Sequence, residues 1–470
     1  MTIQEKLTRK PKIGFLGLMA GSYEPIFPGI IAQQEAYVRD ILKDLEGVAE
    51  FDFPKAATNR QEIEEMVKYF NRCEYDGILM CLLTYSAGMH IVRALKDNNL
   101  PLMLAVIQPD QTVGVDFREY ELTVNQGIHG AQDNWNAILR MGIPCCLMVE
   151  NRKTERFRER VENWCYAAKT VTNLKGMTVG VIGRSPGMGD ILMDDAAFMR
   201  VMGPETVHEY TGSIYKYMVA LTDEEIQAQY EKDFQTFDVD PKLPEKDHKD
   251  AIKIYLALKK LVEEKGWDAY TLHFDSFGAD GRFRQLPLYA ASNLMADGYG
   301  YSAEGDICCA VAVAMGHMLC GISNFTEMYT IDYDLDAVIC CHAGEGNWAT
   351  TDPAYRPRLI DRYLGEGGLE NPPTPIFQPK IGEATLVSLV AIKGDKFRLV
   401  VSKGQILEKF DMDQNEMPYL FYKPDCGIRH CAEEWMRAGG THHEVITAGD
   451  TRERWKMLCE MLEIEYLEVV

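Results

Sequence analysis

The sequence lacks the features that mark secreted, membrane-spanning and nucleic-acid-binding proteins. No stretch reaches the roughly 18 consecutive apolar residues of a membrane helix, and the polar, basic start of the chain predicts no targeting segment. Basic residues are outnumbered, with 49 Lys and Arg against 71 Asp and Glu, for a formal charge of −22. So acidic a chain is not drawn to nucleic acid or to an anionic membrane. We expect a cytoplasmic protein whose partner is a small molecule or a metal ion.

The 13 cysteines include no Cys-X-X-Cys pair, which disfavours thioredoxin chemistry and zinc ribbons. Most lie in apolar runs, such as Cys81 in ILMCLL, which is typical of small buried side chains in a reducing compartment. A thiol enzyme, built on Cys431 beside His430 or on Cys340 beside His342, is an alternative. The apolar neighbours of Cys340 oppose it, because burial raises the pKa of a thiol.

The first third of the chain alternates short apolar runs with longer amphipathic stretches. The pattern predicts strands at residues 12–18, 77–83 and 102–107, and helices at residues 33–45 and 88–96. Strands that alternate with helices are typical of a parallel sheet with helices on both faces.

The rest of the chain divides into two further parts. A second alternating unit begins near Lys175 with a predicted strand at residues 177–183. After Asn347, strands at residues 384–392 and 397–402 alternate in the β manner across a Lys-Gly-Asp-Lys turn, which predicts a hairpin. We therefore predict an α/β protein with two Rossmann-like, doubly wound parallel-sheet domains and a C-terminal antiparallel β-rich domain with closing helices. The predicted boundaries are residues 1–174, 175–346 and 347–470.

Polar residues with metal-ligand chemistry gather in apolar surroundings, mainly in the second domain. Glu304 precedes an apolar helix, Glu327 lies in NFTEMYTID, His342 ends an apolar strand, and His442 and His443 follow later. Glu304 alone could simply be a carboxylate at a helix start. A carboxylate in so apolar a segment as that of Glu327, however, must be paired or metal-bound if it is buried. Together these residues form a mixed oxygen–nitrogen set that suits Mn²⁺, Co²⁺, Fe²⁺ or Zn²⁺ better than Ca²⁺.

Four segments resemble, in the same order, the L-arabinose isomerase family, which is of the L-arabinose/L-fucose isomerase type. QLPLYAASNLMADGYGYSAEGD at residues 285–306 is similar to the family's segment with QLP, GYGF and GEGDW elements. NFTEMYTIDYDLDAVICCH at residues 324–342 resembles its SFMEDYTY…VLGSHM stretch. AGGTHHE at residues 438–444 is similar to GGAHHT, and VNQGIHG at residues 124–130 is similar to LNQTAHG.

This resemblance implies a divalent-metal-dependent isomerase that interconverts an aldose and its ketose, usually with Mn²⁺. It implies Glu304, Glu327, His342 and His443 as the metal ligands, with His442 as the alternative to His443. It further implies that Glu304 and Glu327 are the acid/base pair. Two carboxylates beside an ene-diol suit proton relay, although a hydride shift stays open.

The resemblance also implies residues that line the sugar site and a mode of assembly. These residues are His129 with Gln126, and Met188 in GRSPGMGD is a candidate for substrate contact. The family's homo-oligomers are trimers or hexamers with active sites between subunits. The family's N-terminal TGSQ-L-YG motif is replaced by GLMAGSYEPIFPG at residues 17–29, which leaves the identity of the sugar open.

Two other functions stay open. The chain could be an isomerase or epimerase of a modified sugar, which the altered N-terminal motif favours. It could also be a non-catalytic sugar-binding or regulatory protein, which the Glu/Glu/His/His set disfavours because a binder needs no proton relay. Asp306 and Asp332 are candidates to hold the metal-ligating side chains in place, although a surface or capping role is favoured for each.

Overall fold

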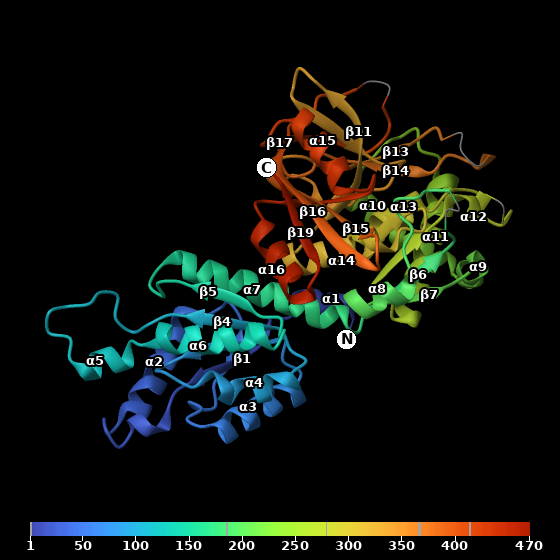
Figure 1. The fold of residues 1–470 in the computed structure, drawn as a ribbon. Coiled ribbons are helices and arrows are strands. Elements are labelled where there is room, and N and C mark those ends of the chain that lie inside the picture. The colour runs from blue at the N-terminus through green and yellow to red at the C-terminus, as the bar shows by residue number, and fades with distance from the viewer. Residues whose placement is uncertain (1, 185–186, 279, 365–367, 413–414) are drawn as a thin grey trace. The chain divides into compact units, whose positions relative to one another are not determined.

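The computed structural model describes residues 2–184, 187–278, 280–364, 368–412 and 415–470 (Figure 1). The chain forms two compact units. The smaller unit consists of Arg9–Asn173 and Glu453–Glu463, and the larger unit consists of the described parts of Met1–Thr8, Leu174–Arg452 and Ile464–Val470. Among the described helices, none has the length and apolar character needed to span a bilayer. The domain boundaries after residues 174 and 346 stay a prediction.

The smaller unit is built on a five-stranded parallel sheet with the strand order β2-β1-β3-β4-β5. Since β1 has β2 on one side and β3 on the other, the sheet grows in both directions from β1, as in a doubly wound fold. Every residue of β3 is buried, as expected for a parallel strand with both faces covered. The elements are β1 (Lys12–Leu18), η1 (Gly21–Tyr23), α2 (Ile30–Asp44), β2 (Glu50–Asp52), α3 (Arg60–Arg72), β3 (Gly77–Leu82), α4 (Gly88–Lys96), β4 (Leu102–Val106), α5 (Glu119–Val124), α6 (Gly127–Arg140), β5 (Cys146–Val149), α7 (Glu155–Leu174) and α16 (Arg452–Leu462).

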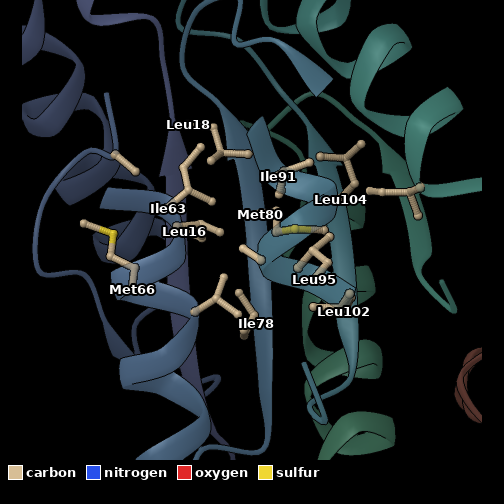
Figure 2. Packing of buried hydrophobic residues seen from close by; sticks show 14 of the residues in the cluster. Leu16, Leu18, Ile63, Met66, Ile78, Met80, Ile91, Leu95, Leu102 and Leu104 are labelled. Carbon is tan, nitrogen blue, oxygen red and sulfur yellow. The ribbon is translucent and has the colours of Figure 1, made fainter. Parts of the chain in front are cut away.

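A continuous apolar layer holds the helices of the smaller unit to its sheet. Leu16, Met80 and Leu104 extend from neighbouring strands toward α3 and α4, and all three are fully buried (Figure 2). Ile63 of α3 and Ile91 of α4 pack on them. Burial of such side chains stabilises the fold by about 1.5–3 kcal/mol each.

The larger unit contains a second parallel sheet with the order β10-β9-β6-β7, again with its first strand inside. Its carboxyl edge is formed by the ends of β6, β9 and β10, which is where ligands bind in open α/β sheets. The elements up to the end of this sheet's helices are α1 (Ile3–Thr8), β6 (Thr178–Ile182), α8 (Asp195–Met202), β7 (Glu205–His208), α9 (Thr211–Met218), α10 (Asp223–Thr236), β8 (Asp238–Val239), α11 (Glu245–Lys265), β9 (Ala269–Leu272), α12 (Phe274–Gly278), α13 (Leu288–Ala296), β10 (Gly300–Ala303) and α14 (Ile307–Cys320).

The C-terminal part of the larger unit is an antiparallel sheet that closes on itself. Its order is β15-β18-β11-β12-β17-β16-β19, and β15 pairs with β16 along their whole length, so the sheet is barrel-like. β19 adds to β16 in parallel. The remaining elements are β11 (Asn324–Asp332), β12 (Ala337–Cys341), η2 (Trp348–Thr350), β13 (Arg358–Asp361), β14 (Pro373–Ile376), β15 (Gly382–Ile392), β16 (Lys396–Leu407), β17 (Tyr419–Pro424), α15 (Ile428–Ala438), β18 (Glu444–Ala448) and β19 (Glu465–Val469).

The predicted fold class is confirmed: parallel sheets with helices precede a C-terminal antiparallel β-rich part. The predicted hairpin is β15 and β16, joined across Lys393–Asp395. A small fourth sheet of order β14-β13-β8 was not predicted. Its strand β8 has two residues, too few for a hydrophobic period to be visible.

We expect Leu104→Ala to destabilise the smaller unit by about 2–5 kcal/mol, because it opens a cavity in a fully buried layer. Leu139→Ala removes the same atoms from a side chain that is 59% exposed, and we expect a change within about 0.5 kcal/mol. Hydrogen-exchange mass spectrometry of peptides from β3 and β4 measures this local stability directly. Equal protection in the two variants would contradict the assignment of this layer as the core.

Candidate metal centre

Glu304 lies at the carboxyl end of β10, in a backbone conformation that few side chains adopt. Its φ is +65°, and Gly305 follows with φ +87°. The backbone N–H of Glu304 donates to Leu272 O, and that of Gly305 donates to the Thr271 hydroxyl. Such left-handed residues cost roughly 1–3 kcal/mol and cluster at functional sites. The fold therefore holds the 9% exposed Glu304 side chain in place at an energetic cost.

The carboxylate at the start of the apolar helix α14 is Asp306, not Glu304. The Asp306 side chain caps the helix by accepting a hydrogen bond from the backbone N–H of Cys309 at 3.0 Å. A capping role for Asp306 thus frees Glu304, two residues earlier, to face a site.

Pairing of the barrel strands brings Glu327 beside two histidines. Glu327 of β11 lies opposite Cys341, the last residue of β12, so His342 follows at the same end. On the other edge of β11, β18 begins at Glu444, directly after His443. A β-bulge follows Glu327 in β11, and bulges commonly re-aim side chains next to functional sites.

The structure brings both glutamates together with His442 and His443, while His342 lies beside Glu327 and is not part of that group of donor atoms. His443 Nε2 lies 3.0 Å from Glu327 Oε1 and 3.5 Å from Glu304 Oε2. His442 Nε2 lies 3.3 Å from Glu304 Oε2, and His342 Nε2 lies 3.3 Å from Glu327 Oε1. Donor atoms of Glu304, Glu327, His442 and His443 all fall within 4.8 Å of one another. The choice between His442 and His443, and the ligand role of each residue, stay predictions.

Each of the three imidazoles has its Nδ1 beside a second carboxylate. The pairs are His443 with Asp306 Oδ2 at 2.9 Å, His442 with Asp190 Oδ2 at 2.7 Å, and His342 with Glu345 Oε2 at 2.8 Å. A carboxylate on Nδ1 leaves Nε2 as the nitrogen that can bind a metal.

Sequence reasoning found one of these outer carboxylates and missed two. Asp306 was predicted, whereas Asp190 and Glu345 were not, because contacts across the fold leave no local pattern. The proximity of Glu345 to His342, three residues earlier, was the available signal. Asp332 has the capping role that the sequence favoured over a partner of the metal ligands: its carboxylate accepts backbone N–H groups of Asp334 and Leu335 in the β11–β12 turn.

The pKa values show that the two glutamates are held as anions. Burial would raise the pKa of Glu304, but hydrogen bonds from His442 and His443 hold it well below its ordinary value. Burial also opposes ionisation of Glu327, yet the nearby His342 and His443 lower its pKa to about 2. Conversely, burial would lower the pKa of His342, but Glu345 and Glu327 raise it to about 10. The pair of carboxylates therefore attracts positive charge to this point.

These residues fit a divalent cation. The buried Nε2 of His443 has no hydrogen-bond partner among the described residues, although two carboxylate oxygens lie within 3.5 Å of it. A cation bound at about 2.0–2.2 Å from nitrogen and oxygen donors would satisfy this atom, and donors 4.8 Å apart or less can share one ion. Two carboxylates with imidazoles match Mn²⁺, Fe²⁺, Co²⁺ or Zn²⁺.

The predicted sugar-site residues belong to both units. In the smaller unit, Gln126 precedes the first residue of α6, and His129 lies in the first turn. His129 Nδ1 is 3.4 Å from Gln126 Oε1, and its ring is 4.8 Å from that of Tyr85. In the larger unit, the half-buried Met188 lies in the loop after β6, two residues before Asp190. Their substrate contacts stay predictions.

The structure disfavours the thiol-enzyme alternative. All 13 cysteines are free thiols. Burial raises the pKa of Cys340 well above its ordinary value, and that of Cys431 to about 12. His430 Nε2 contacts Val470 O, while the Cys431 thiol lies against the Ser402 hydroxyl. Neither thiol is activated as a nucleophile.

The chain is similar to L-arabinose isomerases over most of its length. Residues 200–321 match the model of the L-arabinose isomerase central domain, and residues 322–465 match that of the L-arabinose isomerase C-terminal domain. The L-arabinose isomerase of Geobacillus kaustophilus is 25% identical over 430 residues, which cover 88% of this chain and 85% of that protein. The L-arabinose isomerase of Phocaeicola vulgatus is 26% identical over 437 residues, which cover 88% of this chain and 84% of that protein. The L-arabinose isomerase of Clostridium beijerinckii is 27% identical over 404 residues, which cover 83% of this chain and 80% of that protein.

We expect Mn²⁺ to raise the thermal unfolding midpoint of the metal-free chain, because an ion that binds only the folded state stabilises it by about 2.7 kcal/mol at 100 times its Kd. His443→Gln removes a donor nitrogen and should abolish most of this shift. His430→Gln, on the exposed side of α15, should keep it. Differential scanning fluorimetry measures all three proteins. A full shift in His443→Gln would contradict the placement of the metal centre.

Proposed function

The chain belongs to the L-arabinose isomerase-like family and is a sugar isomerase, and we propose that it interconverts an aldose and its ketose with a divalent cation, most simply Mn²⁺, held by Glu304, Glu327, His342 and His443. The observation that carries this proposal is the convergence of two buried glutamates with imidazole nitrogens at 3.0–3.5 Å. His442 contacts Glu304 from the more exposed side of the same group.

Aldose–ketose isomerisation moves a proton from C2 to C1 while the carbonyl moves from C1 to C2. A cation in this centre would act as a Lewis acid toward the sugar oxygens. In the first step one glutamate takes the C2 proton, the C2–H electron pair forms the C1–C2 double bond, and O1 gains a proton. In the second step the O2–H proton leaves, the electron pair forms the C2 carbonyl, and C1 receives a proton. All atoms and electrons of the sugar are conserved.

Glu304 and Glu327 are the residues that we propose for this proton relay. They approach the same imidazole nitrogen, His443 Nε2, from different elements: the end of β10 and strand β11. Their environments also differ, because Glu304 is contacted by the half-exposed His442 and Glu327 by the buried His342. Two carboxylates in unequal environments can act as acid and base in turn. This arrangement favours the enediol route over a hydride shift.

Several further properties of the chain belong to the same proposal. We propose a cytoplasmic enzyme, which the 13 free thiols support. We also propose a homo-oligomer, trimer or hexamer, with His129, Gln126 and Met188 at the sugar site. The relatives' names support L-arabinose as a substrate. The segment GLMAGSYEPIFPG at residues 17–29, in place of the family's motif, supports a less common or substituted sugar instead.

We expect ketose formation from at least one aldose of a panel that contains L-arabinose, D-galactose, L-fucose and several substituted sugars. Chelator should abolish turnover and Mn²⁺ should restore it, because the proposed reaction needs a cation that acts as a Lewis acid on the sugar oxygens. Chromatographic analysis of the products measures the reaction. Mn²⁺ binding without turnover on any sugar would point to a substrate outside the panel, whereas absence of both would favour a non-catalytic sugar-binding protein.

We expect Glu304→Gln and Glu327→Gln each to lower kcat by more than about 100-fold, because general acid–base groups contribute about 10²–10⁴-fold. Glu231→Gln, on the exposed face of α10, is the matched control and should keep wild-type turnover. Circular dichroism verifies that each variant is folded. Near-normal kcat in either site variant would exclude it from the acid/base pair.

A further inference from the structure

A buried chain of contacts leads from His342 away from the metal centre to Tyr301. Glu345 Oε2 lies 2.8 Å from His342 Nδ1, and Glu345 Oε1 accepts a hydrogen bond of 2.7 Å from the Tyr301 hydroxyl. Glu345 is 2% exposed and Tyr301 is 1% exposed. Among the described residues the Tyr301 phenol is the hydrogen-bond donor to this buried carboxylate, whereas Glu345 Oε2 and His342 Nδ1 are in contact at 2.8 Å without hydrogen-bond geometry.

This chain of contacts joins the parallel sheet that contains β10 to the barrel-like sheet that contains β12. Tyr301 belongs to β10, three residues before Glu304, and Glu345 follows β12, three residues after His342. The hydrogen bond between Tyr301 and Glu345 therefore connects β10, which precedes Glu304, to the segment after β12 that contains His342. Of the three outer carboxylates, Glu345 is also the one whose remaining oxygen is held by a buried hydroxyl, whereas Asp190 is 41% exposed at its side chain.

Ring packing near Tyr301 does not depend on its hydroxyl. The ring of Phe325 meets that of Tyr301 edge-on at 5.7 Å and that of His342 at 5.0 Å. The ring of the neighbouring Tyr270 of β9 lies 5.3 Å from that of Tyr301 and is likewise fully buried, but no residue that the structure describes forms a hydrogen bond with its hydroxyl. The two tyrosines therefore differ in one respect that matters here, which is the hydrogen bond to Glu345.

We propose that Tyr301 and Glu345 are positioning residues that hold the His342 ring with Nε2 toward the metal centre. The inference rests on the proposed function, because it assigns to His342 a metal-binding nitrogen. Without the phenol, the Glu345 carboxylate loses the donor that fixes its rotation, and the His342 ring loses the contact that fixes its own. Neither residue touches the sugar or the cation.

The first experiment compares Mn²⁺ affinity, by isothermal titration calorimetry of the metal-free full chain, between Tyr301→Phe and the matched control Tyr270→Phe. We expect Tyr301→Phe to bind Mn²⁺ about 10- to 100-fold more weakly, as when partners of metal-ligating histidines are removed, and its Mn²⁺ EPR spectrum to differ from that of the wild type. Tyr270→Phe should match the wild type in both. Wild-type affinity and an unchanged EPR spectrum in Tyr301→Phe would overturn the proposal.

The second experiment separates positioning from a general effect on folding. In a His342→Gln background, Tyr301→Phe should cause no further loss of Mn²⁺ affinity, because the residue through which it acts is gone. The same fold loss in both backgrounds would overturn the proposal. Glu345→Gln, which keeps the side-chain shape, is a second variant and should weaken Mn²⁺ binding as Tyr301→Phe does.

The two proposals fail in different ways. If the wild type itself binds no Mn²⁺, the proposed function fails and the inference with it. If the wild type binds Mn²⁺ and forms ketose while Tyr301→Phe matches it in affinity and EPR spectrum, the inference alone fails.

Discussion

The larger unit is organised around one electrostatic requirement: two buried carboxylates, Glu304 and Glu327, must share a small volume. Like charges so close together repel unless positive charge lies between or around them. The Nε2 atoms of three imidazoles lie beside the two glutamates. The Nδ1 atoms of the same imidazoles contact Asp190, Asp306 and Glu345. A divalent cation between the two glutamates would balance their charge, and the neutral imidazoles could then bind it through Nε2. The left-handed backbone of Glu304 and the bulge after Glu327 are local costs of meeting this requirement.

Much of the fold could be predicted because its signals are local. The apolar run at residues 12–18 is β1, and the apolar stretch after Asp306 is α14. The turn Lys393–Lys396 likewise marked the hairpin of β15 and β16. Closure of the antiparallel sheet was beyond a single sequence, because it depends on pairings between strands far apart in the chain, such as Thr326 with Glu444.

In the candidate site too, features with a local sequence signal could be predicted, and features that depend on long-range contacts could not. Residue type and resemblance were enough to name Glu304, Glu327 and His443, whose donor atoms the structure groups with those of His442, and His342, which lies beside Glu327. Asp332 stayed open between a partner of the metal ligands and a capping residue, because a carboxylate at the end of a strand has the same sequence pattern in both roles, and in the structure it closes a turn. Asp190 is absent from the prediction because it meets His442 across 252 positions of chain, a separation at which composition and period carry no signal.

The division of the chain between its two units has a consequence for how the protein can be taken apart. The polypeptide passes from one unit to the other near residues 8, 173, 452 and 463. Helix α16 packs in the smaller unit, where Cys146 lies against Met457, and β19 then returns to pair with β16. Neither unit therefore corresponds to one uninterrupted stretch of the gene. A stop codon after residue 452 would remove a helix from one unit and a strand from the other, because residues 453–470 contribute to both units.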